Sequence, residues 1–207
     1  MDHLAGAEVR VIEGRVLYVD RNHVWLARGQ KLLKSEDEGL TWNKRAKLPV
    51  NGLRQILSIH RVGRRLGRVG FHHFGLTGND SGIVIGHRHI FYLLHQKYEL
   101  DGGEPISGSR PLAFCLGSRM AYYGEYRENL NRTEVHIWAA DKVEKRWRPV
   151  WRFENVRHVH GVFFDPYTGA YWVTTGDEDI ESAIWMTPDR FHTLKKIAGG
   201  SQRFRAI

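Results

Sequence analysis

Apolar and polar residues alternate over short segments along most of the 207-residue chain. Residues 133–138 and 147–153, for example, carry apolar side chains at every second position. A period of two is typical of β-strands with one face in a core. No convincing period of a long amphipathic helix is present. The pattern therefore predicts an all-β protein.

The predicted strands fall into four groups of four, at residues 13–50, 51–104, 110–155 and 158–199, within one domain over 1–207. Polar and turn-forming residues separate the strands within each group. The strands are expected at 15–20, 23–29, 31–35 and 41–48; at 54–62, 66–76, 82–86 and near 96–100; at 112–117, 120–126, 133–138 and 147–153; and at 160–166, 169–176, 182–187 and 193–198.

One turn between predicted strands carries a distinctive pattern. The stretch KSEDEGLTW follows the spacing SxDxGxTW, with Ser35, Asp37, Gly39, Thr41 and Trp42 as its members. A calcium loop would need further oxygen ligands, ending in a glutamate about twelve residues along, and these are missing. A turn fits better, because Ser and Asp side chains accept hydrogen bonds from nearby backbone N–H groups and Gly supplies positive φ.

The same pattern recurs further along the chain. At the same offsets, IWMTPDRFHTL has Thr187, Asp189, Phe191, Thr193 and Leu194. Asp141 follows another strand-like run, and in the second group His87 and His89 take the places of Ser and Asp. Positions 37, 89, 141 and 189 lie about fifty residues apart, which is the length of a four-stranded antiparallel blade.

These turns resemble the Asp boxes of sialidase-like β-propellers, also called BNR repeats. The segment HVHGVFFDPYTGAYWVTTGDED is also similar to uncharacterised bacterial members of that family. The resemblance implies a β-propeller of about four blades, with Asp-box turns at the periphery and a ligand-binding face where the innermost strands converge. It does not extend to true sialidases, because no RIP motif precedes residue 35 and no arginine triad can be assigned.

The end of the sequence bears on the number of blades. Residues 201–207 resemble the start of the innermost strand of a further blade, and sialidase-like rings have six or seven blades. We therefore expect an incomplete part of such a ring, which could associate with another copy through open blade edges. A self-closed four-bladed ring is the alternative.

Composition and charge narrow the class of partner. The chain is 42% hydrophobic and carries a formal net charge of +8, which favours attraction to polyanions. Its basic residues are scattered through turns without a nucleic-acid motif, so a solvated basic surface is favoured over a nucleic-acid site.

The single cysteine, Cys115, excludes an intramolecular disulfide and lies in an apolar run that favours burial. Without a signal peptide or a run of about eighteen apolar residues, we expect a cytoplasmic protein with no membrane span.

Two histidines at the start of the fourth group form the first candidate site. His158 and His160 lie two residues apart in RHVHGVFFD and therefore on one face of a strand. Two such imidazoles can hold a divalent metal with a third ligand from elsewhere, or His160 can act as a general base. The alternative is a pair of hydrogen-bonded polar residues at a strand start.

Carboxylates form two further candidates. Glu125 lies among tyrosines, including Tyr123, whose rings could stack on a sugar. Glu125 could instead end a strand and pair with a nearby arginine. Asp177 and Asp179, in TTGDEDIES, could serve as acid and base or bind a cation, and a solvated acidic turn is the alternative.

Arginines near the predicted inner strands, Arg110 and Arg205 among them, could face an anionic ligand. Two hypotheses follow. In the first, the protein acts on or binds an anionic glycan; as an enzyme it would be a glycoside hydrolase or polysaccharide lyase, with His160, Glu125, Asp177 and Asp179 as its catalytic residues. In the second, it is a non-catalytic propeller that binds a protein or a glycan on the same face.

Overall fold

The computed structural model describes residues 11–49, 70–78, 80–95, 99–108 and 110–205. These residues form sixteen β-strands and one short 3-10 helix, η1 (Gln202–Phe204). The strands make four four-stranded antiparallel sheets, in each of which neighbours in sequence are neighbours in space. The prediction of an all-β chain built from four-stranded antiparallel units is confirmed.

Each sheet takes its strands from one continuous stretch of the chain. The first sheet contains β1 (Arg15–Val19), β2 (Val24–Arg28), β3 (Lys31–Ser35) and β4 (Asn43–Lys47). The second contains β5 (Phe71–Gly78), β6 (Ser81–Gly86), β7 (His89–Leu93) and β8 (Leu100–Pro105). The third contains β9 (Phe114–Leu116), β10 (Met120–Gly124), β11 (Val135–Asp141) and β12 (Trp147–Phe153). The fourth contains β13 (Val159–Phe164), β14 (Tyr171–Thr175), β15 (Ala183–Thr187) and β16 (Lys195–Gly199).

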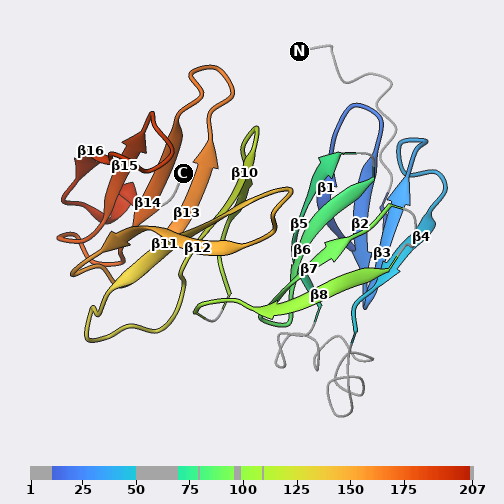
Figure 1. Ribbon diagram of the computed structural model, residues 1–207, viewed down its shortest axis with the longest axis horizontal. Helices are drawn as coiled ribbons and strands as arrows, with labels where there is room; N and C mark the ends of the chain where they lie inside the picture. The colour runs from blue at the N-terminus through green and yellow to red at the C-terminus, as the bar shows by residue number, and fades with distance from the viewer. Residues whose placement is uncertain (1–10, 50–69, 79, 96–98, 109, 206–207) are drawn as a thin grey trace.

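Consecutive sheets pack face to face around three hydrophobic clusters. The first cluster joins the first and second sheets, where the rings of Trp25 and Phe74 lie 4.7 Å apart between centroids. The second joins the second and third sheets around Tyr123, and the third joins the third and fourth sheets around Tyr122 and Tyr171. The first strands of the sheets contact one another in order, β1 with β5, β5 with β9 and β9 with β13 (Figure 1). Central strands are therefore buried on both faces, which explains their runs of consecutive apolar residues.

The second sheet corrects the predicted strand assignment. The segment expected to form its second strand, 66–76, overlaps its first strand, β5, and 82–86 lies in its second strand, β6. The strand predicted at 54–62 lies outside the described residues. His87 and Arg88 form the tight turn between β6 and β7, with φ of 52° and 66°, so this turn is not equivalent to the SxDxGxTW turn. Two residues with positive φ are the geometry of a two-residue hairpin.

The C-terminal region also differs from its prediction. Residues 201–207 were expected to begin a strand, but their described part contains η1, and the backbone N–H of Gln202 donates to Asp179 Oδ1 at 2.8 Å. Among the described residues, no helix is long and apolar enough to cross a membrane.

Two turns between third and fourth strands share one set of hydrogen bonds. In the Ser35 turn (residues 35–42), Ser35 Oγ accepts the N–H of Gly39 at 2.8 Å, and Asp37 Oδ1 accepts the N–H of Thr41 at 2.8 Å. The Thr187 turn (residues 187–194) has equivalent bonds. Asp141 ends β11, the third strand of its sheet, but its carboxylate accepts the N–H of Val143 and pairs with Arg119 instead.

The single cysteine is buried, as predicted. Cys115 lies in β9, within the third cluster, and 6% of its surface is exposed. Burial raises the pKa of its thiol to about 12. The thiol is therefore protonated and unreactive in the folded protein.

Candidate functional site

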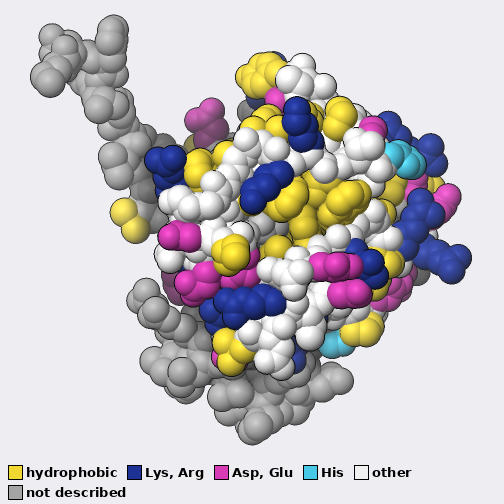
Figure 2. All heavy atoms as spheres, turned by 90° about the vertical axis from the view of Figure 1, so that its left-hand side faces the viewer, with side chains coloured by type: hydrophobic (Ala, Val, Ile, Leu, Met, Phe, Trp, Pro, Cys, Tyr) yellow, Lys and Arg dark blue, Asp and Glu magenta, His cyan; other side chains and the backbone are white. Residues whose placement is uncertain are grey.

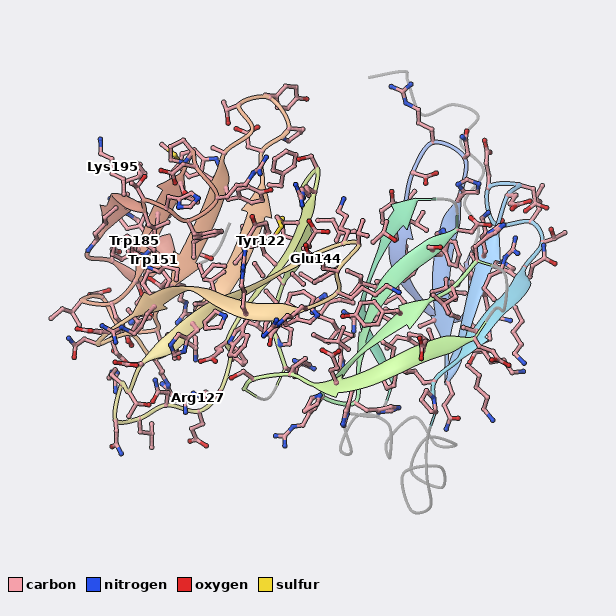
Figure 3. The ribbon with its side chains drawn as sticks, in the orientation of Figure 1. Tyr122, Arg127, Glu144, Trp151, Trp185 and Lys195 are labelled. Carbon is pink, nitrogen blue, oxygen red and sulfur yellow. The ribbon has the colours of Figure 1, made fainter. Side chains whose placement is uncertain are left out.

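Loops from the second, third and fourth sheets border one cleft of about 570 Å³. Arg88 comes from the β6–β7 turn, Arg127 from the β10–β11 loop, and Asp177 from the segment after β14. Figure 3 shows Arg127 on its loop, well separated from Glu144 beyond the other end of β11. The residues that line the cleft are Arg88, Gly108, Tyr126, Arg127, Glu128, Arg157, His158 and Asp177. Ligands bind where loops of several elements converge in this way.

Two of the predicted histidines and one predicted carboxylate meet at this cleft. Nε2 of His158 lies 3.2 Å from Asp177 Oδ1, and Nε2 of His160 lies 3.1 Å from the same oxygen. The three groups offer ligand atoms that all lie within 4.8 Å of one another. The ring of Tyr126 covers His158 at 4.2 Å between centroids. His158 is 3% exposed, whereas His160 and Asp177 are only partly buried.

The local backbone explains how these side chains meet. The pairing of β13 with β14 shifts register between Val159 and Gly161, which leaves His160 as the extra residue of a β-bulge. The N–H of Gly176 donates to the carbonyl of His158 at 3.0 Å. Gly176 has φ of 77°, and a Cβ there would lie 2.3 Å from the carbonyl oxygen of Glu181. Glycine is therefore required at the bend that brings Asp177 to the histidines.

Glu181 fixes the loop after Gly176. Its carboxylate accepts the backbone N–H groups of Arg157 at 2.5 Å and of Asp177 and Glu178 at 3.3 Å. It also pairs with Arg132 at 3.3 Å. Burial alone would raise the pKa of Glu181, but these donors hold it below its ordinary value. Glu181 was not among the predicted residues; its only signal in the sequence is a carboxylate four residues beyond Asp177, spaced to accept backbone N–H groups of the same loop.

Opposite charges surround Asp177. Nη1 of Arg157 lies 3.2 Å from Asp177 Oδ2, and Nη1 of Arg205 lies 3.9 Å from Oδ1. Partial burial would raise the pKa of Asp177, but the two histidines and Arg157 keep it lowered. Burial and the neighbouring His158 lower the pKa of His160, although bonds to Gly176 O and Asp177 oppose that shift. The site therefore holds a carboxylate and, at His160, a neutral imidazole.

Two other predicted residues do not face a ligand. Tyr123 is 2% exposed and lies in the second cluster, stacked on Trp138. Glu125 is 4% exposed, and its carboxylate accepts hydrogen bonds from Ser107 Oγ and from Trp138 Nε1 at 2.8 Å, besides the N–H of His136 at 3.1 Å. The expectation of an acidic group and a sugar platform here is corrected, because Tyr123 is buried between the second and third sheets and Glu125 is enclosed by Ser107 and β11.

The remaining predicted residues divide between the cleft and its surroundings. Arg205 reaches the site through Asp177, as described above. Asp179 is exposed and binds the backbone of Gln202, so it stabilises η1 rather than joining the cluster. The backbone N–H of Arg110 donates to Tyr126 O at 3.5 Å. Burial lowers the pKa of His72, and the charge of the Arg110 side chain lowers it further.

On one face of the molecule, positive charge is not concentrated. On the face in Figure 2, which includes β15 and β16, Lys and Arg side chains are spread among acidic ones around an apolar centre. This arrangement fits a solvated basic surface better than a continuous track for a nucleic-acid backbone.

Comparison with known proteins identifies the architecture. No protein-family model and no curated protein matches the chain. Its fold is similar to the extracellular domain of BT4673 from B. thetaiotaomicron, with a TM-score of 0.54, 10% identity, and coverage of 91% of this chain and 22% of the other. A chain of the Nidogen/Laminin complex has a TM-score of 0.50, 13% identity, and coverage of 86% and 61%. A chain of the Mitotic Checkpoint Complex has a TM-score of 0.54, 9% identity, and coverage of 87% and 51%.

The fold is a β-propeller. The chain spans less than two thirds of the length of each of these similar structures. At these identities the likeness establishes the propeller architecture alone. The architecture is compatible with many functions, and the cleft carries the chemistry that distinguishes them.

Proposed function

We propose that this β-propeller is a binding scaffold that holds an acidic segment of a partner protein in the cleft around Arg127 and His158. One observation carries the proposal: loops of three sheets converge there, and the guanidinium groups of Arg88, Arg127 and Arg157 outnumber the cleft's carboxylates. Arg88 is exposed and makes no ion pair with any described residue, so its charge is available to a ligand. Guanidinium groups bind carboxylates through charge-assisted, bidentate hydrogen bonds.

One further point supports a protein as the partner, and another supports a place for this chain among the sialidase-like propellers. Two of the similar structures are chains of protein assemblies, the Nidogen/Laminin complex and the Mitotic Checkpoint Complex. The matching hydrogen bonds of the Ser35 and Thr187 turns support assignment to the sialidase-like propellers, of the uncharacterised bacterial kind. A non-catalytic member of that family would use the cleft for recognition alone.

A binding titration tests this proposal. The probe is a fluorescein-labelled oligo-glutamate peptide, followed by fluorescence anisotropy in buffer with EDTA. We expect saturable binding that weakens as salt is added, since exposed charges are screened. Arg88→Glu should weaken binding at least about tenfold, because it places a like charge beside the peptide.

The matched control is Arg21→Glu, which reverses an exposed charge in the connection between β1 and β2, outside the cleft. This variant should bind as the wild type does. Equal weakening by both variants would reduce the effect to net charge and refute a specific site. Tighter binding of a uronic-acid oligosaccharide than of the peptide would favour the glycan as partner.

Cleavage of an anionic glycan is the second candidate function. It is favoured by the neutral imidazole of His160 beside Asp177, because a neutral imidazole can take a proton from a substrate. Incubation with uronic-acid polysaccharides would then release new reducing ends or unsaturated products, and His160→Ala would abolish the release. An absence of products together with binding of the peptide leaves the scaffold function standing.

A further inference from the structure

We infer that His158, His160 and Asp177 bind a divalent first-row transition-metal ion of the zinc type. This inference concerns the ion and does not depend on which partner occupies the cleft. Three observations carry it: the hydrogen-bond partners of His158, the distances between the three ligand atoms, and the groups that hold those ligands from behind.

The ring of His158 faces an acceptor on each side. Nδ1 lies 3.3 Å from the carbonyl oxygen of Arg127, and Nε2 lies 3.2 Å from the carboxylate of Asp177. A neutral imidazole has one N–H, so it can satisfy only one of two acceptors. With Nδ1–H directed at the carbonyl, the lone pair of Nε2 points at a carboxylate oxygen. This arrangement calls for a cation between Nε2 and Oδ1, either a metal ion or a second proton.

The distances suit a metal ion. Both histidine Nε2 atoms lie 3.1–3.2 Å from the same oxygen, Asp177 Oδ1. Ligands about 2.0–2.1 Å from a tetrahedral zinc ion are about 3.3 Å from one another. The ligand atoms of the two histidines lie within 4.8 Å of each other, so the rings must draw closer to each other to hold an ion. Two imidazoles and one carboxylate are a donor set that divalent zinc, cobalt and iron accept.

The groups behind the ligands are those that metal sites require. The Nδ1–H of His158 is directed at a backbone carbonyl, which fixes Nε2 as the ligand atom. The other carboxylate oxygen of Asp177, Oδ2, pairs with Arg157 at 3.2 Å, and this contact keeps Oδ1 turned toward the histidines. Since His158 and Asp177 line the cleft, a fourth coordination position would face it.

Two contacts oppose binding of the ion, and each must rearrange when the ion binds. Nε2 of His160 lies 2.8 Å from Gly176 O, so this ring must exchange a hydrogen bond for a metal bond. Arg205 lies 3.9 Å from Oδ1, but 44% of its side chain is exposed and it can turn into solvent. Removal of Arg205 should therefore leave metal affinity unchanged or strengthen it, whereas it should weaken binding of an acidic peptide.

Metal binding is measured directly on the full chain, produced without a histidine tag and stripped with EDTA. Isothermal titration with Zn²⁺ should give one tight site per chain, confirmed by elemental mass spectrometry after dialysis. Co²⁺ should produce the visible absorption of a tetrahedral site. Asp177→Asn, which keeps the side-chain shape, should weaken binding at least about a hundredfold, and Arg157→Ala about tenfold to a hundredfold.

His192→Ala is the matched control, because it removes an exposed histidine at the Thr187 turn. It should retain the site. Circular dichroism verifies that each variant folds. His160→Gln is the second ligand variant and should also lose the ion; its ring is less buried than that of His158, so its removal disturbs the fold less. A wild-type chain without stoichiometric metal, or an Asp177→Asn variant that retains it, would overturn the inference and leave a buried imidazolium in place of the ion. Peptide binding in EDTA is judged separately, so either proposal can fail alone.

Discussion

The Ser35 turn and the Thr187 turn share one backbone conformation but have different residues at one position of positive φ. The Thr187 turn repeats the two bonds of the Ser35 turn, with Phe191 N–H to Thr187 Oγ1 at 3.0 Å and Thr193 N–H to Asp189 Oδ1 at 2.8 Å. Both turns place two successive residues at positive φ. The second of these is Gly39 in the first sheet, with φ of 91°, and Phe191 in the fourth, with φ of 72°.

The difference shows that packing can outweigh backbone strain. A bulky residue held at positive φ costs about 1–3 kcal/mol. Phe191 is 4% exposed, and its ring lies 5.3 Å from Tyr122 and 6.0 Å from Tyr171 between centroids. Loss of a buried phenylalanine costs about 3–5 kcal/mol, which exceeds the strain. The side-chain oxygens therefore set the turn, and the surroundings decide whether Gly or Phe occupies it.

Phe191→Gly should give the largest effect. The variant relieves strain but leaves a hole between Tyr122 and Tyr171, so we expect the free energy of unfolding to fall by about 2–4 kcal/mol. Urea denaturation followed by circular dichroism measures the change. A variant as stable as the wild type would mean that relief of strain balances packing, and the comparison of the two turns would be wrong.

Acid should then weaken both turns in parallel. Hydrogen bonds from Thr41 and Thr193, more than from the other donors, lower the pKa of Asp37 and of Asp189 to about 2. Between about pH 4 and pH 2 the unfolded chain binds more protons than the folded chain, so stability falls as pH falls. Asp37→Asn and Asp189→Asn should each flatten that fall, by similar amounts, in urea titrations across this range. Unequal flattening would show that the carboxylates differ in environment despite their matching bonds.

Gly39→Ala should destabilise by about 1 kcal/mol, since alanine is strained at φ of 91°. The new Cβ would also lie 3.1 Å from Ile12 Cδ1. Thermal unfolding measures this loss. A stabilised variant would indicate that the Ser35 turn, like the Thr187 turn, gains from added packing.

The smallest effects should come from the threonine hydroxyls. Thr41 Oγ1 donates to Asp37 Oδ2 at 2.6 Å, and Thr193 Oγ1 donates to Asp189 Oδ2 at 2.7 Å. Thr41→Val and Thr193→Val keep the shape and remove one exposed bond each, so about 0.5–1 kcal/mol should be lost in each case. Chemical denaturation of the two variants side by side provides the measurement, and a loss in only one turn would break the equivalence.

The sequence predicted three of the four sheets because their strands carry the expected apolar pattern between clear turns. It failed in the second sheet, where the His87–Arg88 turn contains none of the Gly, Asn or Asp residues that usually mark a two-residue hairpin. The regular spacing of the SxDxGxTW turns then reinforced the error, since it assigned His89 to a turn between third and fourth strands.

Part of the cleft was predictable and part was not. Spacing alone placed His158 and His160 close together, although β13 begins only at Val159 and the bulge at His160 is what turns both rings to one side. The following hairpin brought Asp177 to them. Glu125 was misjudged because its partners, Ser107 and Trp138, come from other segments of the chain. No local pattern shows which carboxylates will be enclosed when separate strands pack together.

The buried thiol of Cys115 is a natural probe of local opening in the folded protein. Because the sequence has one cysteine, a thiol-specific reagent reports on a single point between the third and fourth sheets. The thiol reacts only when local opening between those sheets exposes it. The labelling rate therefore measures how often this opening occurs, and no probe has to be introduced. Loops of these two sheets also border the cleft, so a molecule that bridges them there should slow the labelling.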